Sequence, residues 1–189
     1  NPISVKVSFL GTGTSQGVPV IGCHCEACLS VNTHDKRLRS SILLETEAST
    51  VVVDTGPDFR QQMLRTNIRH LDAVVYTHEH RDHIAGMDDI RSFNFLQKKS
   101  MDLYGEKRVL QSLRISFPYV FAKNKYPGVP QVVLHTIWGG RVNRPFAMAL
   151  GSSREDSLVD SALADRLGAP YGDVERLSRR IVAASERGH

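Results

Sequence analysis

The apolar positions of this 189-residue sequence fall into short runs that predict a mixed α/β fold. Residues 5–10 alternate between apolar and polar side chains, which is typical of a strand with one buried face. Residues 41–46 and 50–54 are rich in aliphatic side chains and predict a hairpin that turns across residues 47–49. The short apolar run at residues 73–76 indicates a buried strand. Further strands are expected at residues 103–105 and 131–137.

Between these strands, apolar residues recur at helical spacing in the segments 58–65, 88–96 and 106–115. The inward-facing residues expected there are Phe59, Met63 and Leu64, then Ile90, Phe93 and Leu96, then Val109, Leu110 and Leu113. Residues 117–121 are expected to form an aromatic loop that either lines a substrate pocket or simply packs. Beyond residue 137 the pattern predicts one strand (144–150) and two helices (157–167 and 173–186). We therefore divide the chain into residues 1–137 and a second part, residues 138–189.

Length and composition suit an ordinary globular domain, with 41% hydrophobic and 23% charged residues. The formal charge of +4 mildly favours anionic substrates, but it is too small to predict nucleic acid binding. No apolar run reaches membrane-spanning length, and the first residues lack the apolar core of a signal peptide. We expect a cytoplasmic protein without a membrane partner.

A cluster of metal-ligand residues follows the apolar run at 73–76: His78, His80, Asp82 and His83. Neutral imidazole and carboxylate oxygen both suit Zn²⁺, Mn²⁺ or Fe²⁺. The alternative is a solvated polar loop in which Glu79, Arg81 and Asp82 face water. Three histidines and a carboxylate within six residues are uncommon in such a loop, so we interpret the stretch as a metal site.

This His-x-His-x-Asp-His pattern after a strand resembles the signature of the metallo-β-lactamase-fold hydrolases. The resemblance implies an αββα sandwich whose second half is not evident in this sequence. It also implies that His78 and His80 help hold one metal ion, and that Asp82 and His83 help hold a second. Paired Zn²⁺ or Mn²⁺ ions would bind ester oxygens and lower the pKa of a bridging water. Asp82 would also help to orient the nucleophile.

The three cysteines, Cys23, Cys25 and Cys28, lie within six residues. An odd number at this spacing makes a poor disulfide framework, whereas three thiolates can converge on one structural zinc. The alternative is a set of reduced cysteines with no ligand. A structural zinc needs a fourth ligand. His24 would be strained in that role, and neither His135 nor His189 is supported by spacing.

The glycine-rich residues 11–19 follow the first predicted strand, and their glycines permit tight turns. A turn over the end of the sheet is favoured over a phosphate cradle, because the Lys-Ser/Thr ending of a P-loop is absent. Gly-Thr-Gly-Thr-Ser-x-Gly-Val-Pro followed by Gly-Cys-x-Cys-x-x-Cys is similar to the PhnP-like branch of the superfamily. That branch contains cyclic phosphodiesterases of phosphonate breakdown, in which the cysteines hold a structural zinc together with a distant histidine.

Asp54 ends a predicted strand, where its carboxylate either caps the following turn or orients metal-bound groups from outside the ligand set. The Asp-x-Gly-Pro pattern of the family favours the second role. The resemblance covers residues 3–137. Superfamily members complete their metals further along, with a histidine, a bridging aspartate and a final histidine. The residues of those types beyond position 150 are Asp156, Asp160, Asp165, Asp173 and His189, and none sits in a strand-end context that resembles the later motifs of the family. A homodimer is one way to complete the site.

These features predict a metal-dependent hydrolase that acts on a small or cyclic phosphodiester. One alternative is a tRNA 3′-processing endonuclease, because that branch shares Phe-Leu-Gly-Thr-Gly and Thr-His-x-His-x-Asp-His. The cysteine cluster and the modest charge argue against it. The other alternative is a non-catalytic metal-binding scaffold.

Overall fold

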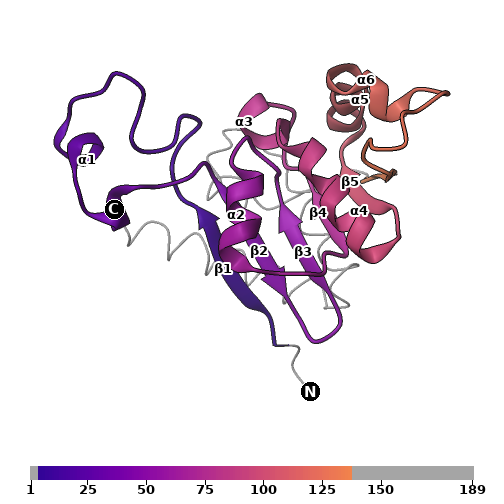
Figure 1. Cartoon of the computed structure of the whole chain (residues 1–189), viewed down its shortest axis with the longest axis horizontal. Coiled ribbons are helices and arrows are strands. Elements are labelled where there is room, and N and C mark those ends of the chain that lie inside the picture. The colour runs from indigo at the N-terminus through magenta and orange to yellow at the C-terminus, as the bar shows by residue number, and fades with distance from the viewer. Residues whose placement is uncertain (1–3, 138–189) are drawn as a thin grey trace.

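The computed structural model of the chain describes residues 4–137, which form one six-stranded sheet with helices packed against it (Figure 1). The strands follow one another in space as they do in sequence, in the order β1-β2-β3-β4-β5-β6. The first three strands are antiparallel, and β3 to β6 are parallel. The strands are β1 (Lys6–Gly11), β2 (Ser41–Glu45), β3 (Thr50–Val53), β4 (Ala73–Val75), β5 (Met101–Gly105) and β6 (Val132–Thr136).

Helices connect the parallel strands, as parallel pairing requires. Figure 1 shows α2 and α4 lying over one face of the sheet. The helices are α1 (Glu26–Leu29), α2 (Phe59–Thr66), α3 (Arg81–Ile84), α4 (Arg91–Gln97), α5 (Lys107–Ser116) and α6 (Pro118–Phe121), with 3₁₀ turns η1 (Thr33–Asp35) and η2 (Met87–Ile90). The predicted α/β class and the predicted hairpin between β2 and β3 are therefore confirmed.

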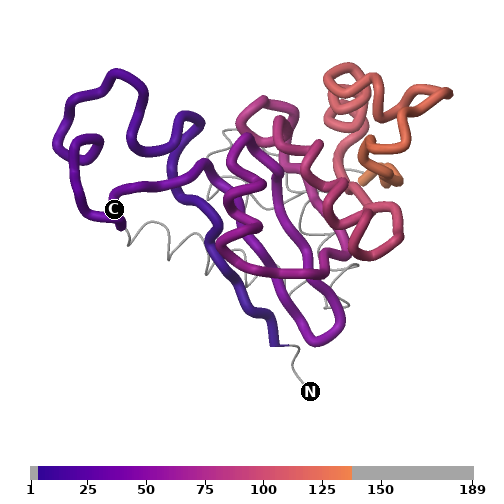
Figure 2. The backbone as a smooth tube through the Cα atoms, viewed as in Figure 1, coloured from indigo at the N-terminus to yellow at the C-terminus, as the bar shows by residue number. Residues whose placement is uncertain are grey.

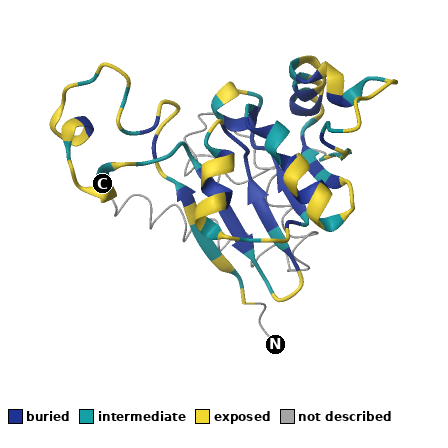
Figure 3. Cartoon of the chain, viewed as in Figure 1, coloured by how far each residue is buried: buried dark blue, intermediate teal, exposed yellow. Residues whose placement is uncertain are grey.

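The core lies between the sheet and the helices. Leu43, Val52 and Val74 point to that side and pack with Phe59 of α2 and Phe93 of α4. The alternate residues of β2, β3 and β4 are also fully buried, so these strands are covered on both faces, as Figure 3 shows by their colour. Burial on both faces explains why these strands are continuously apolar rather than alternating.

Three details differ from the sequence-based expectations. Leu64 and Leu96 were expected to face inward, but they are 63% and 58% exposed. The helix expected over 88–96 is divided, because η2 turns the chain before α4 begins at Arg91. The expected aromatic loop at 117–121 is the short helix α6, which starts at Pro118, where the fixed φ of proline favours a first turn.

The long connection between β1 and β2 extends away from the sheet edge and carries α1 (Figure 2). Its ends are tied together by Gly13 N–H to Leu38 O (2.8 Å) and Val18 N–H to Arg37 O (2.8 Å). A Cβ on Gly11 would lie 2.1 Å from the carbonyl oxygen of Arg39, so only glycine allows this approach. The glycine-rich segment is thus a backbone turn beside the sheet, as expected.

The strand and helices predicted for residues 138–189, and the second part of the chain as a unit, lie outside the described residues. In residues 4–137, no helix has both the length and the apolar character that crossing a membrane requires.

Candidate metal centre

The predicted metal ligands lie at the carboxyl end of β4. Strands β3 and β4 are parallel, with Val53 opposite Val75, so the residues that follow each strand meet at one edge of the sheet. Asp54 directly follows β3, and its N–H donates to Val75 O at 2.9 Å. The loop after β4 carries the first ligands, and α3 begins at Arg81.

The structure brings the four predicted ligands together. The ring centroid of His78 is 4.6 Å from that of His80 and 3.9 Å from that of His83. Asp82 Oδ2 lies 3.2 Å from His83 Nε2. His78 and His83 are buried, Asp82 is half-buried and His80 is exposed. Among residues 4–137 the spacing of three ligand atoms within 4.8 Å of one another is reached by the cysteine group and not by these four residues. Their imidazole nitrogens and carboxylate oxygens are nevertheless donor types that suit Zn²⁺ or Mn²⁺.

Asp54 is fully buried and accepts three hydrogen bonds behind these ligands. Its Oδ1 accepts from Thr77 N–H at 2.9 Å. Its Oδ2 lies 2.7 Å from both Thr77 Oγ1 and His83 Nδ1. Asp54 has a φ of 63°, an uncommon value for a residue other than glycine. The carboxylate therefore supports the imidazole of His83 directly, in the geometry expected of a group that orients a ligand.

Burial and charge act differently on the two buried histidines. Burial, together with the neighbouring His83, lowers the pKa of His78 to about 4. Burial also opposes protonation of His83, but the charges and hydrogen bonds of Asp54 and Asp82 outweigh it and raise the pKa of His83. At neutral pH His78 is therefore a neutral imidazole, which is the form that binds metal.

Two glycines let the loop after β3 pack against α3. A Cβ on Gly56 would lie 2.1 Å from Asp82 O, and one on Gly86 would lie 2.1 Å from Gly56 O. Thr55 N–H donates to His83 O, and Gly86 N–H donates to Thr55 O, both at 2.8 Å. Backbone contacts thus hold Asp54 and the ligand loop in a fixed relation.

Glu79, which lies between two predicted ligands, forms an ion pair within the protein and is therefore not a freely solvated side chain. Its Oε2 pairs with the guanidinium of Arg108 in α5, and the same guanidinium pairs with Glu106 at 2.5 Å. Burial raises the pKa of Glu79, but its own backbone N–H and Arg108 lower it more, so the net shift is downward. Arg108 therefore links the ligand loop to the start of α5.

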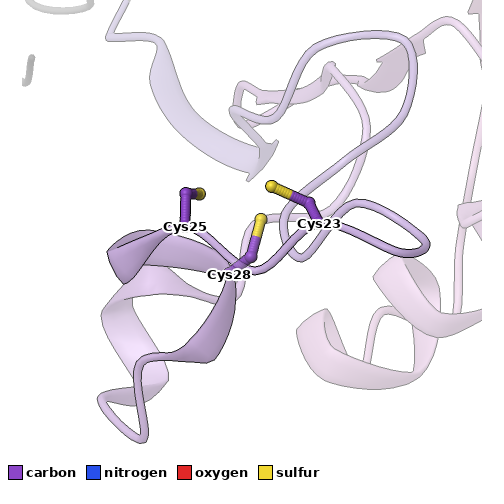
Figure 4. A group of neighbouring side chains, drawn as sticks. All are labelled: Cys23, Cys25 and Cys28. Atoms are coloured by element: carbon purple, nitrogen blue, oxygen red, sulfur yellow. The ribbon is translucent and has the colours of Figure 1, made fainter.

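The cysteine sulfurs face one another in the β1–β2 connection (Figure 4). The ligand atoms of Cys23, Cys25 and Cys28 all lie within 4.8 Å of one another. Tetrahedral zinc with bonds of about 2.3 Å places its sulfurs about 3.8 Å apart, so a small movement closes the site. The backbone N–H of Cys28 and the thiols of Cys23 and Cys28 lower the pKa of Cys25, which favours the thiolate. The three residues therefore fit a zinc ion.

Among residues 4–137, no histidine or carboxylate completes this cysteine group. His135 lies in β6, at the opposite edge of the sheet from β1, where its Nε2 is 2.8 Å from Asp102 Oδ1. Its ring stacks on Tyr104, with centroids 4.7 Å apart. It is a strand residue, as expected, and is not the fourth ligand. His189 lies outside the described residues.

Sequence reasoning missed the residues that support the ligands. Thr77 contacts both Asp54 and His78, and Arg108 binds Glu79 across the fold. Thr77 stands directly before the motif, so its position was a usable signal. No local signal identified Arg108, because the contact spans 29 residues.

Comparison with known proteins agrees with the fold. The family described as the Beta-lactamase superfamily domain matches residues 49–153. The crystal structure of a new diphosphatase from the PhnP family superimposes with a TM-score of 0.65 and 39% sequence identity, over 74% of this chain and 52% of that chain. Zn²⁺-bound PqqB from Methylobacterium extorquens superimposes with a TM-score of 0.50 at 22% identity, over 71% of this chain and 46% of that one.

One sequence relative is named as a transferase and not as a hydrolase. The octanoyltransferase of Porphyromonas gingivalis is 46% identical over 146 residues, which is 77% of this chain but 29% of that protein. The coenzyme PQQ synthesis protein B of Methylobacterium nodulans is 28% identical over 58% of this chain and 40% of its own length. The chain thus spans less than half the length of these curated relatives.

The matched family covers more than half of the chain, so this protein belongs to the β-lactamase superfamily. The described part has the metallo-β-lactamase fold and is PhnP-like, as its similarity to the PhnP-family diphosphatase shows.

Proposed function

We propose that this chain carries the metal-binding half of a metal-dependent hydrolase that cleaves a small or cyclic phosphodiester. The observation that supports the proposal is the proximity of His78 to His80 and His83, and of His83 to Asp82, after β4, with Asp54 hydrogen-bonded to His83. The 39% identity with a PhnP-family diphosphatase supports a phosphorus substrate. We also propose one structural zinc held by Cys23, Cys25 and Cys28.

When bound, Zn²⁺ or Mn²⁺ at a dinuclear site supplies a Lewis acid for phosphoryl oxygens and acidifies the attacking water. The protein positions these groups. His78 and His80 would hold one ion and Asp82 and His83 the other, and Asp82, which is half-buried, would also help to orient the attacking water. The buried Asp54 keeps His83 in place. We expect the remaining metal ligands to be supplied by residues outside 4–137 or by a partner subunit.

A diphosphate is a second candidate substrate, because the structural neighbour at 39% identity is described as a diphosphatase. Both substrates present anionic phosphoryl oxygens and differ in the leaving group. The tRNA-processing alternative is supported only by the shared sequence motif. Measured binding of tRNA with a steep salt dependence would support it further. The octanoyltransferase relative gives no support for acyl transfer, since the similar segment is 29% of that protein.

The proposal is tested by measuring hydrolysis of bis-p-nitrophenyl phosphate and of ADP by the protein loaded with Zn²⁺ or Mn²⁺. Wild-type protein should turn over at least one of them, and His78→Ala should lose the activity. His70→Ala is the matched control, because His70 is an exposed histidine that pairs with Asp72 away from the motif. No turnover by the metal-loaded protein, with His78→Ala equally inert, would contradict the proposal. Metal contents of two or three ions per chain would support catalysis, whereas a single zinc that is lost with the cysteines would indicate a scaffold.

A further inference from the structure

The hydroxyl of Thr77 connects two groups of the candidate metal centre, and its chemistry fixes the direction of both contacts. Its Oγ1 is 2.7 Å from Asp54 Oδ2 and 3.0 Å from His78 Nδ1. A carboxylate only accepts hydrogen bonds, so the single hydroxyl proton of Thr77 goes to Asp54. Thr77 then offers a lone pair to His78. The contact is a hydrogen bond only if Nδ1 of His78 carries the imidazole proton.

The same carboxylate oxygen fixes His83. Nδ1 of His83 lies 2.7 Å from Asp54 Oδ2 and must donate to it. In both histidines the neutral ring then has an unprotonated Nε2. Nε2 of His83 faces Asp82 Oδ2 at 3.2 Å, so either a proton on Nε2 or a bound metal ion would lie between the two atoms. Nε2 of His83 and Oδ2 of Asp82 are thus adjacent donors for a metal ion.

We propose that Thr77 is a positioning residue through which Asp54 determines which ring nitrogen of His78 carries the proton. One buried carboxylate thereby fixes the tautomer of two imidazoles, one by direct contact and the other through a hydroxyl. The inference rests on the proposed function only in taking His78 and His83 as metal ligands. The tautomers follow from the hydrogen bonds alone.

Replacing Asp54 by asparagine should reverse the whole chain of hydrogen bonds. The amide oxygen should stay where Oδ1 accepts Thr77 N–H, which places the NH₂ group at the position of Oδ2. That group would donate to Thr77 Oγ1 and to His83 Nδ1. The hydroxyl of Thr77 would then donate to His78 Nδ1. Both histidines should carry their protons on Nε2, where a metal would otherwise bind.

Thr77→Val separates the two branches of this network. Valine has nearly the shape of threonine, and the backbone N–H of residue 77 still reaches Asp54. His78 should lose its preference for the Nδ1-protonated form, whereas His83 should keep it. Thr77→Ser retains the hydroxyl and should behave like the wild-type protein.

The experiment is long-range ¹H–¹⁵N correlation spectroscopy of the full chain labelled in histidine, freed of metal with a chelator and kept at alkaline pH. His78→Gln and His83→Gln assign the resonances. The inference predicts Nδ1-protonated His78 and His83 in the wild type, a change at His78 alone in Thr77→Val, and a change at both in Asp54→Asn. It would be overturned if His78 stayed Nδ1-protonated in Thr77→Val, or if Asp54→Asn altered His83 alone.

Zinc affinity measured against a competing chelator gives a second readout. Thr77→Val and Asp54→Asn should bind zinc at the histidine motif about 10-fold to 100-fold more weakly, and Thr77→Ser should match the wild type. Equal affinity in all four proteins would contradict the role of Thr77. An enzyme that hydrolyses no phosphodiester could still have the predicted tautomers, so the two proposals can fail separately.

Discussion

Gly56 tests whether the position of the ligand loop depends on a backbone contact. In Gly56→Ala, the new Cβ would lie 2.1 Å from Asp82 O and 3.2 Å from its carbonyl carbon. Ordinary contact begins near 3.4 Å. The obstructing atoms are backbone and cannot rotate away, so Asp82 or the loop after β3 must move by about 1 Å. A displacement of about 1 Å near reacting groups can reduce a rate about 100-fold.

We therefore expect Gly56→Ala to lose about 100-fold in phosphodiester hydrolysis and about 10-fold or more in metal affinity. Overpacking should cost about 1–3 kcal/mol of unfolding free energy, measured by urea titration with metal removed. Gly128→Ala is the matched control, because its Cβ would meet the ring of the exposed Tyr126, which can rotate. Wild-type activity and metal affinity in Gly56→Ala would refute this account of the loop.

Three further predictions follow from other contacts. Cys25→Ser should lose one zinc per chain by elemental analysis and should lower the melting temperature, whereas an unchanged zinc content would contradict the cysteine site. The pKa of His78 is lowered from 6.5 to about 4 in the folded protein, so between these pH values His78 is protonated in the unfolded chain but not in the folded chain. Urea titrations of the metal-free protein should therefore show a His78 contribution that lowers stability as pH falls from 6.5 to 4, by up to about 3 kcal/mol, and His78→Gln should lack this slope. Arg108→Met should weaken metal binding about 10-fold by releasing Glu79, whereas Arg114→Met, on the same helix but over the Phe121 ring, should not.

The sequence predicted the strands well because their apolar runs are local and continuous. β4 is an example, since its three residues are apolar, consecutive and fully buried. The residues His78, His80, Asp82 and His83 stand out in the sequence because they lie close together in the chain, and their role as metal ligands stays a prediction.

Features that depend on the tertiary structure were predicted less well. Leu64 and Leu96 have helical spacing, but the faces of α2 and α4 are chosen by the sheet, and both side chains point outward. The pairing of Glu79 with Arg108 brings together residues that are distant in sequence. The role of Thr77 depends on the buried Asp54, which reaches it from a neighbouring strand.

Metal binding at the end of β4 is the central claim, and anomalous scattering from crystals of the full chain grown with Zn²⁺ or Mn²⁺ tests it most directly. The account predicts anomalous peaks within bonding distance of His78, His80, Asp82 and His83, with Asp54 bonded to His83 and not to the metal. A peak confined to the sulfurs of Cys23, Cys25 and Cys28 would contradict it.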